Sequence, residues 1–327
     1  MHRRTIVKTV LAAAMLAGLA AVPAAAEYPE KPIRVIVPTQ QGGSTDVMAR
    51  LFQEAIQRLN LLPQPLVVAN VTGAGGTVGT RQIKDAEPDG YTVGVWHTGL
   101  VTSRAMGVTE YDHDGFEVIA QTGSIPLGLA VRDGAPIQTI EQLVEEASAK
   151  PEEVRIATNI GLTVHFVPLV FQNEADIKLR YVQTGGGSRR LQSILGDHTS
   201  VAIFSSQEFI SYGPSGLKPI VLFADERHPK LPDLPTAKEK GYGVVWDEAF
   251  LWLAPKGTPQ DVIDTLASAL EQAFADPEVL ASFEEQAMNA DFQDGVATTA
   301  MLDALRVRAA EVAAGIGAEL EVDTLPE

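Results

Sequence analysis

Three glycine-rich segments of the chain could bind a negatively charged group through the backbone. They read Gln-Gly-Gly-Ser-Thr at 41–45, Gly-Ala-Gly-Gly-Thr at 73–77 and Gly-Gly-Gly-Ser at 185–188, and a fourth, more polar segment at 158–163 has one glycine. Each precedes a run with helical periodicity, and glycine lets backbone N–H groups approach a ligand closely. Because a helix start carries about half a positive charge, these segments predict anion sites that need no lysine or arginine.

The candidate ligand contacts come from these four segments and from the end of one predicted strand. They are Gln41, Gly42, Gly43, Ser44, Thr45, Asp46, Gly75, Gly76, Thr77, His97, Asn159, Thr163, Gly186 and Ser188. We expect Asp46 to order its glycine loop by accepting loop amides, because a carboxylate would repel an acidic ligand. Trp96 could stack on a flat ligand or pack in the core. Arg189 and Arg190 border the last segment, and we expect at most one of them to turn toward a ligand.

Motifs for catalysis or metal binding are incomplete in this sequence. Val78 stands where a dinucleotide fingerprint needs its third glycine, and no Gly-x-Ser-x-Gly or His-Glu-x-x-His run occurs. The Asp-His-Asp-Gly run at 112–115 lacks the further ligands of a calcium loop, and His165 fits a helix start better than a general base. We therefore expect no catalytic residue, no metal and no cofactor. An unrecognised enzyme remains the alternative to a binding protein.

The elements that must position these segments alternate between strand and helix. Apolar runs predict strands at 33–37, 66–68, 91–96, 116–122, 128–131, 154–157, 179–182, 200–204 and 219–223. The strand–helix–strand order predicts parallel strands with right-handed crossovers. In such an open α/β sheet, ligands lie beyond the carboxyl ends of the strands, where the glycine segments fall. The alternative is that these glycines only make tight turns before helices.

Residues 1–26 have the features of a secretory signal. A basic start with Arg3, Arg4 and Lys8 precedes an apolar run at 10–22 and an alanine stretch that ends at Ala26. The apolar run is shorter than the ~20 residues that a membrane-spanning helix needs. The sequence therefore predicts a periplasmic protein, cleaved after about Ala26 and exported by either the general or the twin-arginine route. It contains no cysteine, so neither a lipid anchor on cysteine nor a disulfide is available.

Charge and length narrow the partners and the architecture. The net charge is −17, and removing the three basic residues within 1–26 makes it −20. So acidic a chain is not expected to bind nucleic acid or anionic lipid. An anionic ligand must then be held by local dipoles rather than by the overall field. The length of 327 residues allows about two domains, at roughly 150 residues each.

Several short motifs recur in order along the chain and together indicate a family. The opening at 28–38 reads Tyr-Pro-Glu-Lys-Pro-Ile-Arg-Val-Ile-Val-Pro. The others are Gly-Gly-Ser-Thr-Asp at 42–46, Gly-Ala-Gly-Gly at 73–76, Pro-Asp-Gly-Tyr-Thr at 88–92, Leu-Pro-Asp-Leu-Pro-Thr at 231–236, Ala-Pro-Lys-Gly-Thr-Pro at 254–259 and Ala-Asp-Pro-Glu-Val at 275–279. With these motifs the chain resembles the receptors of tripartite tricarboxylate transporters, also called the Bug family of solute-binding proteins.

The resemblance implies an α/β type II periplasmic binding protein, with two α/β lobes and a ligand cleft between them. It places lobe one at 27–124 plus 246–327, and lobe two at 125–245. It also implies capture of a small organic carboxylate (a di- or tricarboxylate, an amino acid or an aromatic acid) and delivery to a two-component membrane permease. We expect a monomer. A ligand sensor that feeds a signalling kinase remains the alternative to a transport receptor.

Three short segments depart from the pattern of the family. Thr39-Gln40-Gln41 stand where many relatives have prolines or small residues, and Trp96-His97-Thr98 replace a small polar patch. In the second lobe, Gln183-Thr184-Gly185 stand in place of a tyrosine-lysine-glycine pattern. These changes leave the expected class of ligand unaltered and its identity open.

Overall fold

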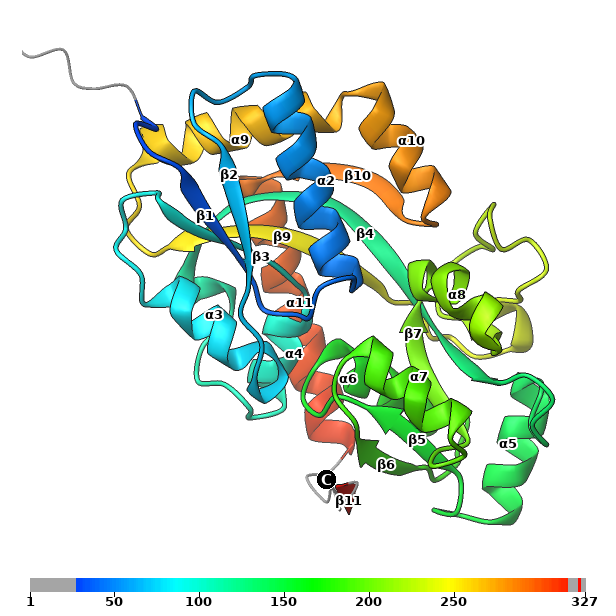
Figure 1. Ribbon diagram of the computed structural model, residues 1–327. Coiled ribbons are helices and arrows are strands. Elements are labelled where there is room, and N and C mark those ends of the chain that lie inside the picture. Colours follow the sequence, from blue (N-terminus) through cyan, green and yellow to red (C-terminus); the bar gives the residue numbers. More distant parts are fainter. Residues whose placement is uncertain (1–27, 317–322, 325–327) are drawn as a thin grey trace, which may run out of the picture.

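The computed structural model describes residues 28–316 and 323–324, whose strands form one continuous mixed sheet (Figure 1). The expected signal sequence lies outside the described residues. The strands are β1 (Ile33–Val37), β2 (Leu66–Asn70), β3 (Thr92–His97), β4 (Phe116–Arg132), β5 (Arg155–Thr158), β6 (Arg180–Gln183), β7 (Val201–Ser205), β8 (Leu217–Leu222), β9 (Asp247–Pro255), β10 (Asn289–Asp294) and β11 (Asp323–Thr324). The helices are α2 (Ser44–Arg58), α3 (Thr77–Lys84), α4 (Gly99–Ala105), α5 (Ile140–Ala149), α6 (Thr163–Glu174), α7 (Gly187–Leu195), α8 (Ser206–Tyr212), α9 (Gln260–Phe274), α10 (Pro277–Glu285) and α11 (Gly295–Ile316). None of the described helices is long and apolar enough to cross a membrane.

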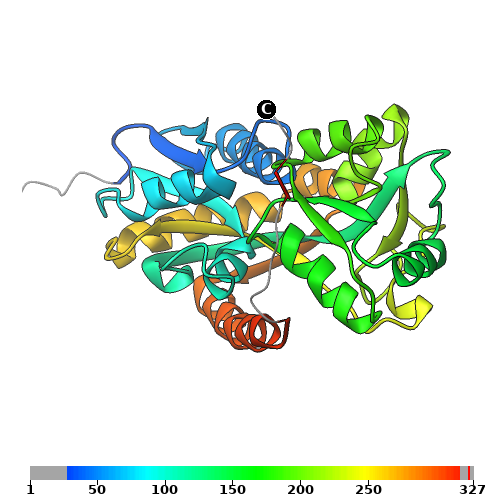
Figure 2. The same cartoon turned by 90° about the horizontal axis from the view of Figure 1, so that it is seen from below.

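Strand β4 runs through both halves of the molecule and joins them. Its first part, to Pro126, pairs antiparallel with β9, whereas Leu127 to Ala130 pair antiparallel with β7. We call lobe one the part built on β1, β2, β3, β9, β10 and the first part of β4. Lobe two is the part built on β5, β6, β7, β8 and the rest of β4. Figure 2 shows the two lobes side by side.

Parallel strands in each lobe direct the candidate loops toward the middle of the molecule. In lobe one, β1 lies between β2 and β3 and is parallel to both, with Ile33 opposite Leu66. In lobe two, β5 lies between β6 and β7 and is parallel to both, with Ile156 opposite Tyr181. Because parallel strands end at the same edge of a sheet, the loops after β1 and β3 lie together, as do those after β5 and β6.

Helix α2 is fixed on the sheet of lobe one by its apolar face. Met48, Phe52 and Ile56 recur at helical spacing and are buried. Phe52 meets Trp252 of β9 edge to face, with ring centroids 6.1 Å apart. Burial of a side chain of this size contributes about 1.5–3 kcal/mol. The start of α2, which follows the first glycine loop, is therefore held in a defined place.

The α/β class predicted from the sequence agrees with the structure, whereas some bounds differ. The sequence predicts separate strands at 116–122 and 128–131, but β4 covers both. Gly123 lies between them with φ of +135°, and the pairing of β4 with β9 shifts register between Gln121 and Ser124. This shift lets one strand bend and continue across both lobes. The lobe boundaries expected after residues 124 and 245 fall within β4 and just before β9.

Candidate ligand-binding site

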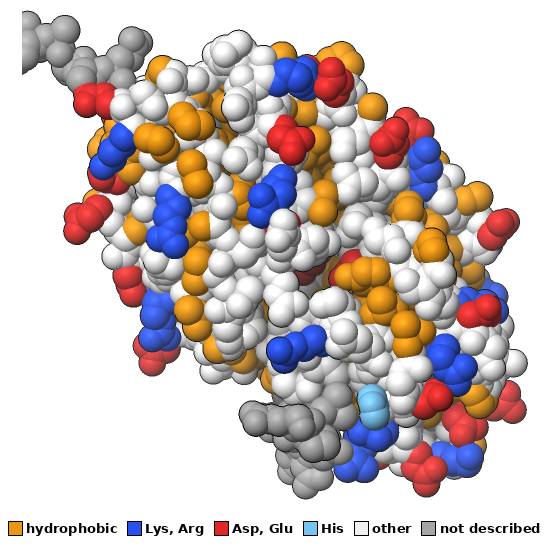
Figure 3. Space-filling model, in the orientation of Figure 1, with side chains coloured by type: hydrophobic (Ala, Val, Ile, Leu, Met, Phe, Trp, Pro, Cys, Tyr) orange, Lys and Arg blue, Asp and Glu red, His pale blue; other side chains and the backbone are white. Residues whose placement is uncertain are grey.

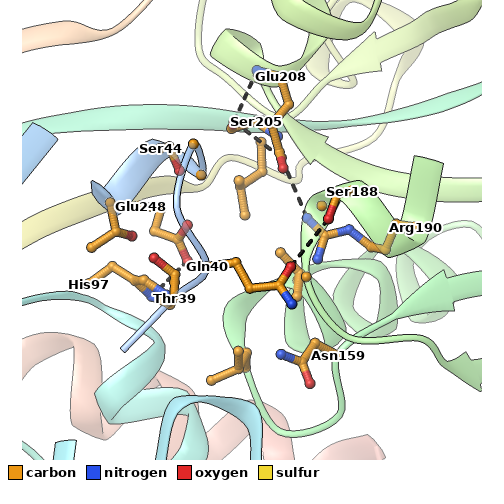
Figure 4. A pocket seen from close by; sticks show the side chains of 18 of the residues that line it. Thr39, Gln40, Ser44, His97, Asn159, Ser188, Arg190, Ser205, Glu208 and Glu248 are labelled. Atoms are coloured by element: carbon orange, nitrogen blue, oxygen red, sulfur yellow. Dashed lines mark hydrogen bonds and ion pairs between the residues drawn. The ribbon is translucent and has the colours of Figure 1, made fainter. Parts of the chain in front are cut away.

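A cavity of about 300 Å³, which we call the central cavity, lies between the lobes. Figure 4 shows side chains from both lobes around it, and Figure 3 shows acidic side-chain atoms in the hollow between the lobes. On the side of lobe one it is lined by residues 39–45, His97 and Glu248. On the side of lobe two it is lined by Leu127, Asn159, Leu162, Val164, residues 186–188, Arg190, Ser205, Glu208 and Tyr212.

A second, more open cavity of about 450 Å³ adjoins the first, and we call it the side cavity. Its walls include residues 72–76, Trp96, residues 183–186 and Arg189. Gln40 lines both cavities, as do Asn159 and Gly186. The glycine segments of the two lobes therefore surround one divided cleft.

Two helices that follow a glycine begin at the central cavity without a side chain that caps them, and α6, which follows Leu162, is a third uncapped helix there. Helix α2 follows Gly43, and α7 follows Gly186; both glycines have extended backbone and no side-chain hydrogen bond to the helix start. By contrast, the side chains of Thr139 and Asp276 cap α5 and α10, which lie away from the cavity. The first N–H groups of α2 and α7 have no partner within their helices, so they can donate to an anion in the cavity.

The loop before α2 is held in shape by Asp46. One oxygen of this buried carboxylate accepts the Gly42 N–H at 2.9 Å, and the other accepts Asn70 Nδ2 at 2.9 Å. Arg50 Nε lies 3.0 Å from the carboxylate as well. Burial opposes ionisation of Asp46, but the contacts with Arg50, Gly42 and Asn70 outweigh it, so its pKa lies below the usual value. As expected from the sequence, Asp46 orders the glycine loop.

A buried histidine–glutamate pair forms part of the wall in lobe one. His97 Nδ1 lies 2.9 Å from Glu248 Oε1 and also accepts the Gly99 N–H at 3.0 Å. The nitrogen accepts from Gly99 only without a proton, and donates to Glu248 only with one. Burial opposes ionisation of Glu248, but the His97 ring, the nearby Thr163 hydroxyl and the charge of Arg190 outweigh it. The pKa of the Glu248 carboxyl is therefore lowered.

An arginine–glutamate pair forms the facing wall in lobe two. Arg190 donates to Gly185 O at 3.0 Å, and its other terminal nitrogen lies 3.4 Å from Glu208 Oε2. The same Glu208 oxygen accepts the Ser205 N–H at 2.9 Å, and Ser205 in turn caps α8. This reciprocal capping fixes the Glu208 carboxylate at the cavity wall.

Comparison with known proteins identifies the family. The model described as tripartite tricarboxylate transporter family receptor (TctC) matches residues 48–307. The chain belongs to this receptor family. Protein BugT of Bordetella pertussis is 30% identical to the receptor over 283 residues, which cover 83% of this chain and 84% of BugT.

Solved structures agree with the fold of the receptor. The periplasmic binding protein BugD is 28% identical, with a TM-score of 0.82 over 90% of this chain and 100% of BugD. MatC from Rhodopseudomonas palustris, solved with bound malate, is 24% identical, with a TM-score of 0.80 over 88% of this chain and 100% of MatC. The likeness to BugD confirms the expected two-lobed binding-protein fold, and the likeness to MatC bears on the fold alone.

Most of the residues predicted as ligand contacts lie at the two cavities of the receptor. Those at the central cavity are Gln41, Gly42, Gly43, Ser44, Thr45, His97, Asn159, Gly186 and Ser188. Gly75 and Gly76 line the side cavity instead. The loop after β2 is therefore separated from the central cavity, and Gln40 stands between them.

Three residues predicted as ligand contacts, Asp46, Thr77 and Thr163, line neither cavity. Asp46 points into its own loop, as described above. Thr77 donates its hydroxyl to Ala74 O at 2.9 Å, within the turn that starts α3. Thr163 is fully buried in the first turn of α6, near Glu248. Asp46 and Thr77 therefore bond to the backbone of their own loops, and Thr163 is buried beside Glu248 rather than at a cavity surface.

Trp96 is packed rather than offered to a ligand. It is only 2% exposed, and its ring stacks on that of His97, with centroids 4.0 Å apart. A Cβ atom added to Gly76 would overlap Trp96 Cη2, so the glycine makes room for the indole. Core packing, one of the two alternatives for Trp96, is the one that the structure supports.

Sequence reasoning missed the two glutamates of the central cavity. Glu208 follows Ser205 by three residues, which is the spacing of a capping box, and this signal was available in the sequence. Glu248 lies near the start of β9 and carried no motif. Arg190 turns inward, as allowed for one of the two arginines, and its side chain is buried.

Proposed function

We propose that this receptor binds a small organic carboxylate in the central cavity and releases it to a transporter. The observation that carries the proposal is the pair of uncapped helix starts, α2 from lobe one and α7 from lobe two, at one cavity. A volume of about 300 Å³ suits a small molecule. The dipoles of two helices supply positive potential in a protein whose net charge is strongly negative.

Family membership supports the transport role. The proposed course is export directed by residues 1–26, capture in the periplasm and delivery to a two-component membrane permease. The receptor acts as a monomer without cofactor, metal or catalysis. Residues 27–124 with 246–327, and residues 125–245, move as two lobes that close on the ligand. MatC, which has the same fold, was solved with malate, and a carboxylate ligand for this receptor is consistent with that.

A thermal-shift screen over mono-, di- and tricarboxylates, aromatic acids, amino acids and neutral sugars tests the proposal. A carboxylate present at a hundredfold over its Kd should add about 2.7 kcal/mol of stability. It should also be recovered chemically unchanged after long incubation, as expected for a receptor and not for an enzyme. Stabilisation by sugars alone, with no response to any carboxylate, would overturn the proposal.

A further inference from the structure

The central cavity contains two buried carboxylates, one from each lobe. Glu208 comes from α8 in lobe two and is 6% exposed, and Glu248 comes from β9 in lobe one and is 5% exposed. Both line the same cavity, together with one guanidinium, that of Arg190, and one imidazole, that of His97. Two carboxylates thus share this cavity with a single guanidinium.

A glycine at position 187 leaves room for the Glu208 carboxylate at the cavity wall. A Cβ atom added to Gly187, the first residue of α7, would overlap Glu208 Oε1 and lie 2.8 Å from its Cδ. No other residue type fits position 187 while the carboxylate keeps its position. Glu208 therefore screens the start of α7. The acid in the first turn of α2, Asp46, is paired with Arg50, so the start of α2 is left as the stronger anion site of the cavity.

Two buried polar atoms on the facing walls of the central cavity, one from each lobe, have hydrogen-bonding capacity that the described residues do not fully use. Arg190 Nε makes no hydrogen bond, and Glu248 Oε1 accepts none when the His97 ring accepts the Gly99 N–H. Both side chains are more than nine-tenths buried. A buried polar atom without a partner is costly, so the cavity is suited to a ligand that supplies both an acceptor for Arg190 and a donor for Glu248.

We propose that the ligand is an amino-carboxylate, with its carboxylate on the amides of α2 and its protonated amine beside Glu208 and Glu248. This inference rests on the proposed function and narrows it. An ionised carboxylate can accept hydrogen bonds but cannot donate them. Glu208 and Glu248 therefore attract an ammonium group and repel a second carboxylate. A simple dicarboxylate would place its second charge against at least one of them.

Isothermal titration of matched ligand pairs tests this inference. The pairs are aspartate with succinate, glutamate with glutarate, alanine with propionate, and phenylalanine with 3-phenylpropionate. In at least one pair, the amino-carboxylate should bind tenfold or more tightly than the counterpart without the amine. If the counterparts bind equally or better, the inference is overturned and the proposed function stands. If neither these ligands nor any other carboxylate binds, the inference and the proposed function are both overturned.

Substitution of the two glutamates locates the amine. Glu208→Gln keeps a side chain that can complete the capping box, and Glu248→Gln keeps the volume of the wall. Each should lower the preference for the amino-carboxylate within its pair at least tenfold. Glu271→Gln removes the same charge from an exposed position on α9 and should leave the preference unchanged. An unaltered preference in both cavity variants, with unaltered melting temperatures, would contradict the inference. If Glu208→Gln fails to fold, Glu248→Gln alone decides.

Discussion

The side chain of Gln40 in lobe one meets Ser188 in lobe two, whose Oγ donates to Gln40 Oε1 at 3.2 Å. Gln40 follows β1, and Ser188 lies in the first turn of α7, so this contact joins two of the loops that the sequence marks as candidates. Because Gln40 lines both cavities, its amide also stands between the central and the side cavity. One hydrogen bond thus both bridges the lobes and bounds the space for a ligand.

Removal of this bridge should weaken ligand binding and hardly affect folding. In Gln40→Ala the lobes lose a contact across the cleft and the central cavity loses part of its wall. We expect the Kd to rise about three- to tenfold, which is about 0.7–1.4 kcal/mol, in calorimetric titration. Gln57→Ala, on the exposed face of α2, is the matched control and should leave the Kd unchanged. Equal affinity in the two variants would show that Gln40 does not bound the site.

Gly187→Ala should disturb the central cavity because its Cβ atom collides with Glu208. Either the carboxylate or the start of α7 must move, at a cost of about 1–3 kcal/mol of folding stability. Ligand affinity should change at least tenfold. Gly243 is exposed and lies outside both cavities, and an added Cβ atom would meet only Glu174 Oε1, at an ordinary contact distance of 3.5 Å, so Gly243→Ala should leave both quantities unchanged. Identical denaturation midpoints for the two variants would contradict the packing described here.

Alanine substitutions at Gly76 and Gly42 distinguish the stability cost of a steric clash from that of backbone strain. Both have positive φ, +91° and +83°, but a Cβ atom meets Trp96 at Gly76 and open space at Gly42. Gly42→Ala should therefore cost only the strain, about 1–2 kcal/mol. Gly76→Ala should cost measurably more, because the indole of Trp96 must also shift. Chemical denaturation measures both, and a larger loss in Gly42→Ala would refute the assignment.

Asp291 should make stability depend on pH. Its Oδ2 accepts Gln121 Nε2 at 2.9 Å and Ser124 Oγ at 3.2 Å, and burial, with the nearby charge of Asp247, raises its pKa to about 7. The folded pKa is raised above the unfolded value, so the stability that this group contributes is present below about pH 4 and is lost as the pH rises through 7. Asp291→Asn mimics the protonated form. It should stabilise the protein at pH 8 by up to about 2 kcal/mol, given partial exposure, and not at pH 4. A gain of equal size at both values would exclude this cause.

The sequence predicted the local parts of this structure better than its long-range contacts. Strand β1 has the predicted bounds, because Ile33–Val37 is a short apolar run between polar segments that is buried in the centre of a parallel sheet. Strands β9 and β10 were not predicted. Their pairing with β4 depends on residues more than a hundred positions away, and a single sequence does not report such partners.

For the candidate site, too, the sequence predicted the local features better than the long-range contacts. The glycine loops could be found because glycine before a helix has a local cause. The pairs His97–Glu248 and Arg190–Glu208 could not, because each joins different elements. The glycine loops and the two glutamates come together only in the folded protein. The sequence therefore indicated an anion site and did not reveal the acidic side chains within it.

The most direct test of the account is a calorimetric titration of Ser44→Pro and Ser44→Ala with the carboxylate that stabilises the wild type. Ser44 is the first residue of α2, where proline is accommodated, and Gly43 before it has the extended backbone that proline requires. Proline removes the backbone N–H and the hydroxyl, whereas alanine removes only the hydroxyl. We predict at least tenfold weaker binding in Ser44→Pro and less than a threefold change in Ser44→Ala. Wild-type affinity in Ser44→Pro would contradict the claim that the start of α2 binds the carboxylate.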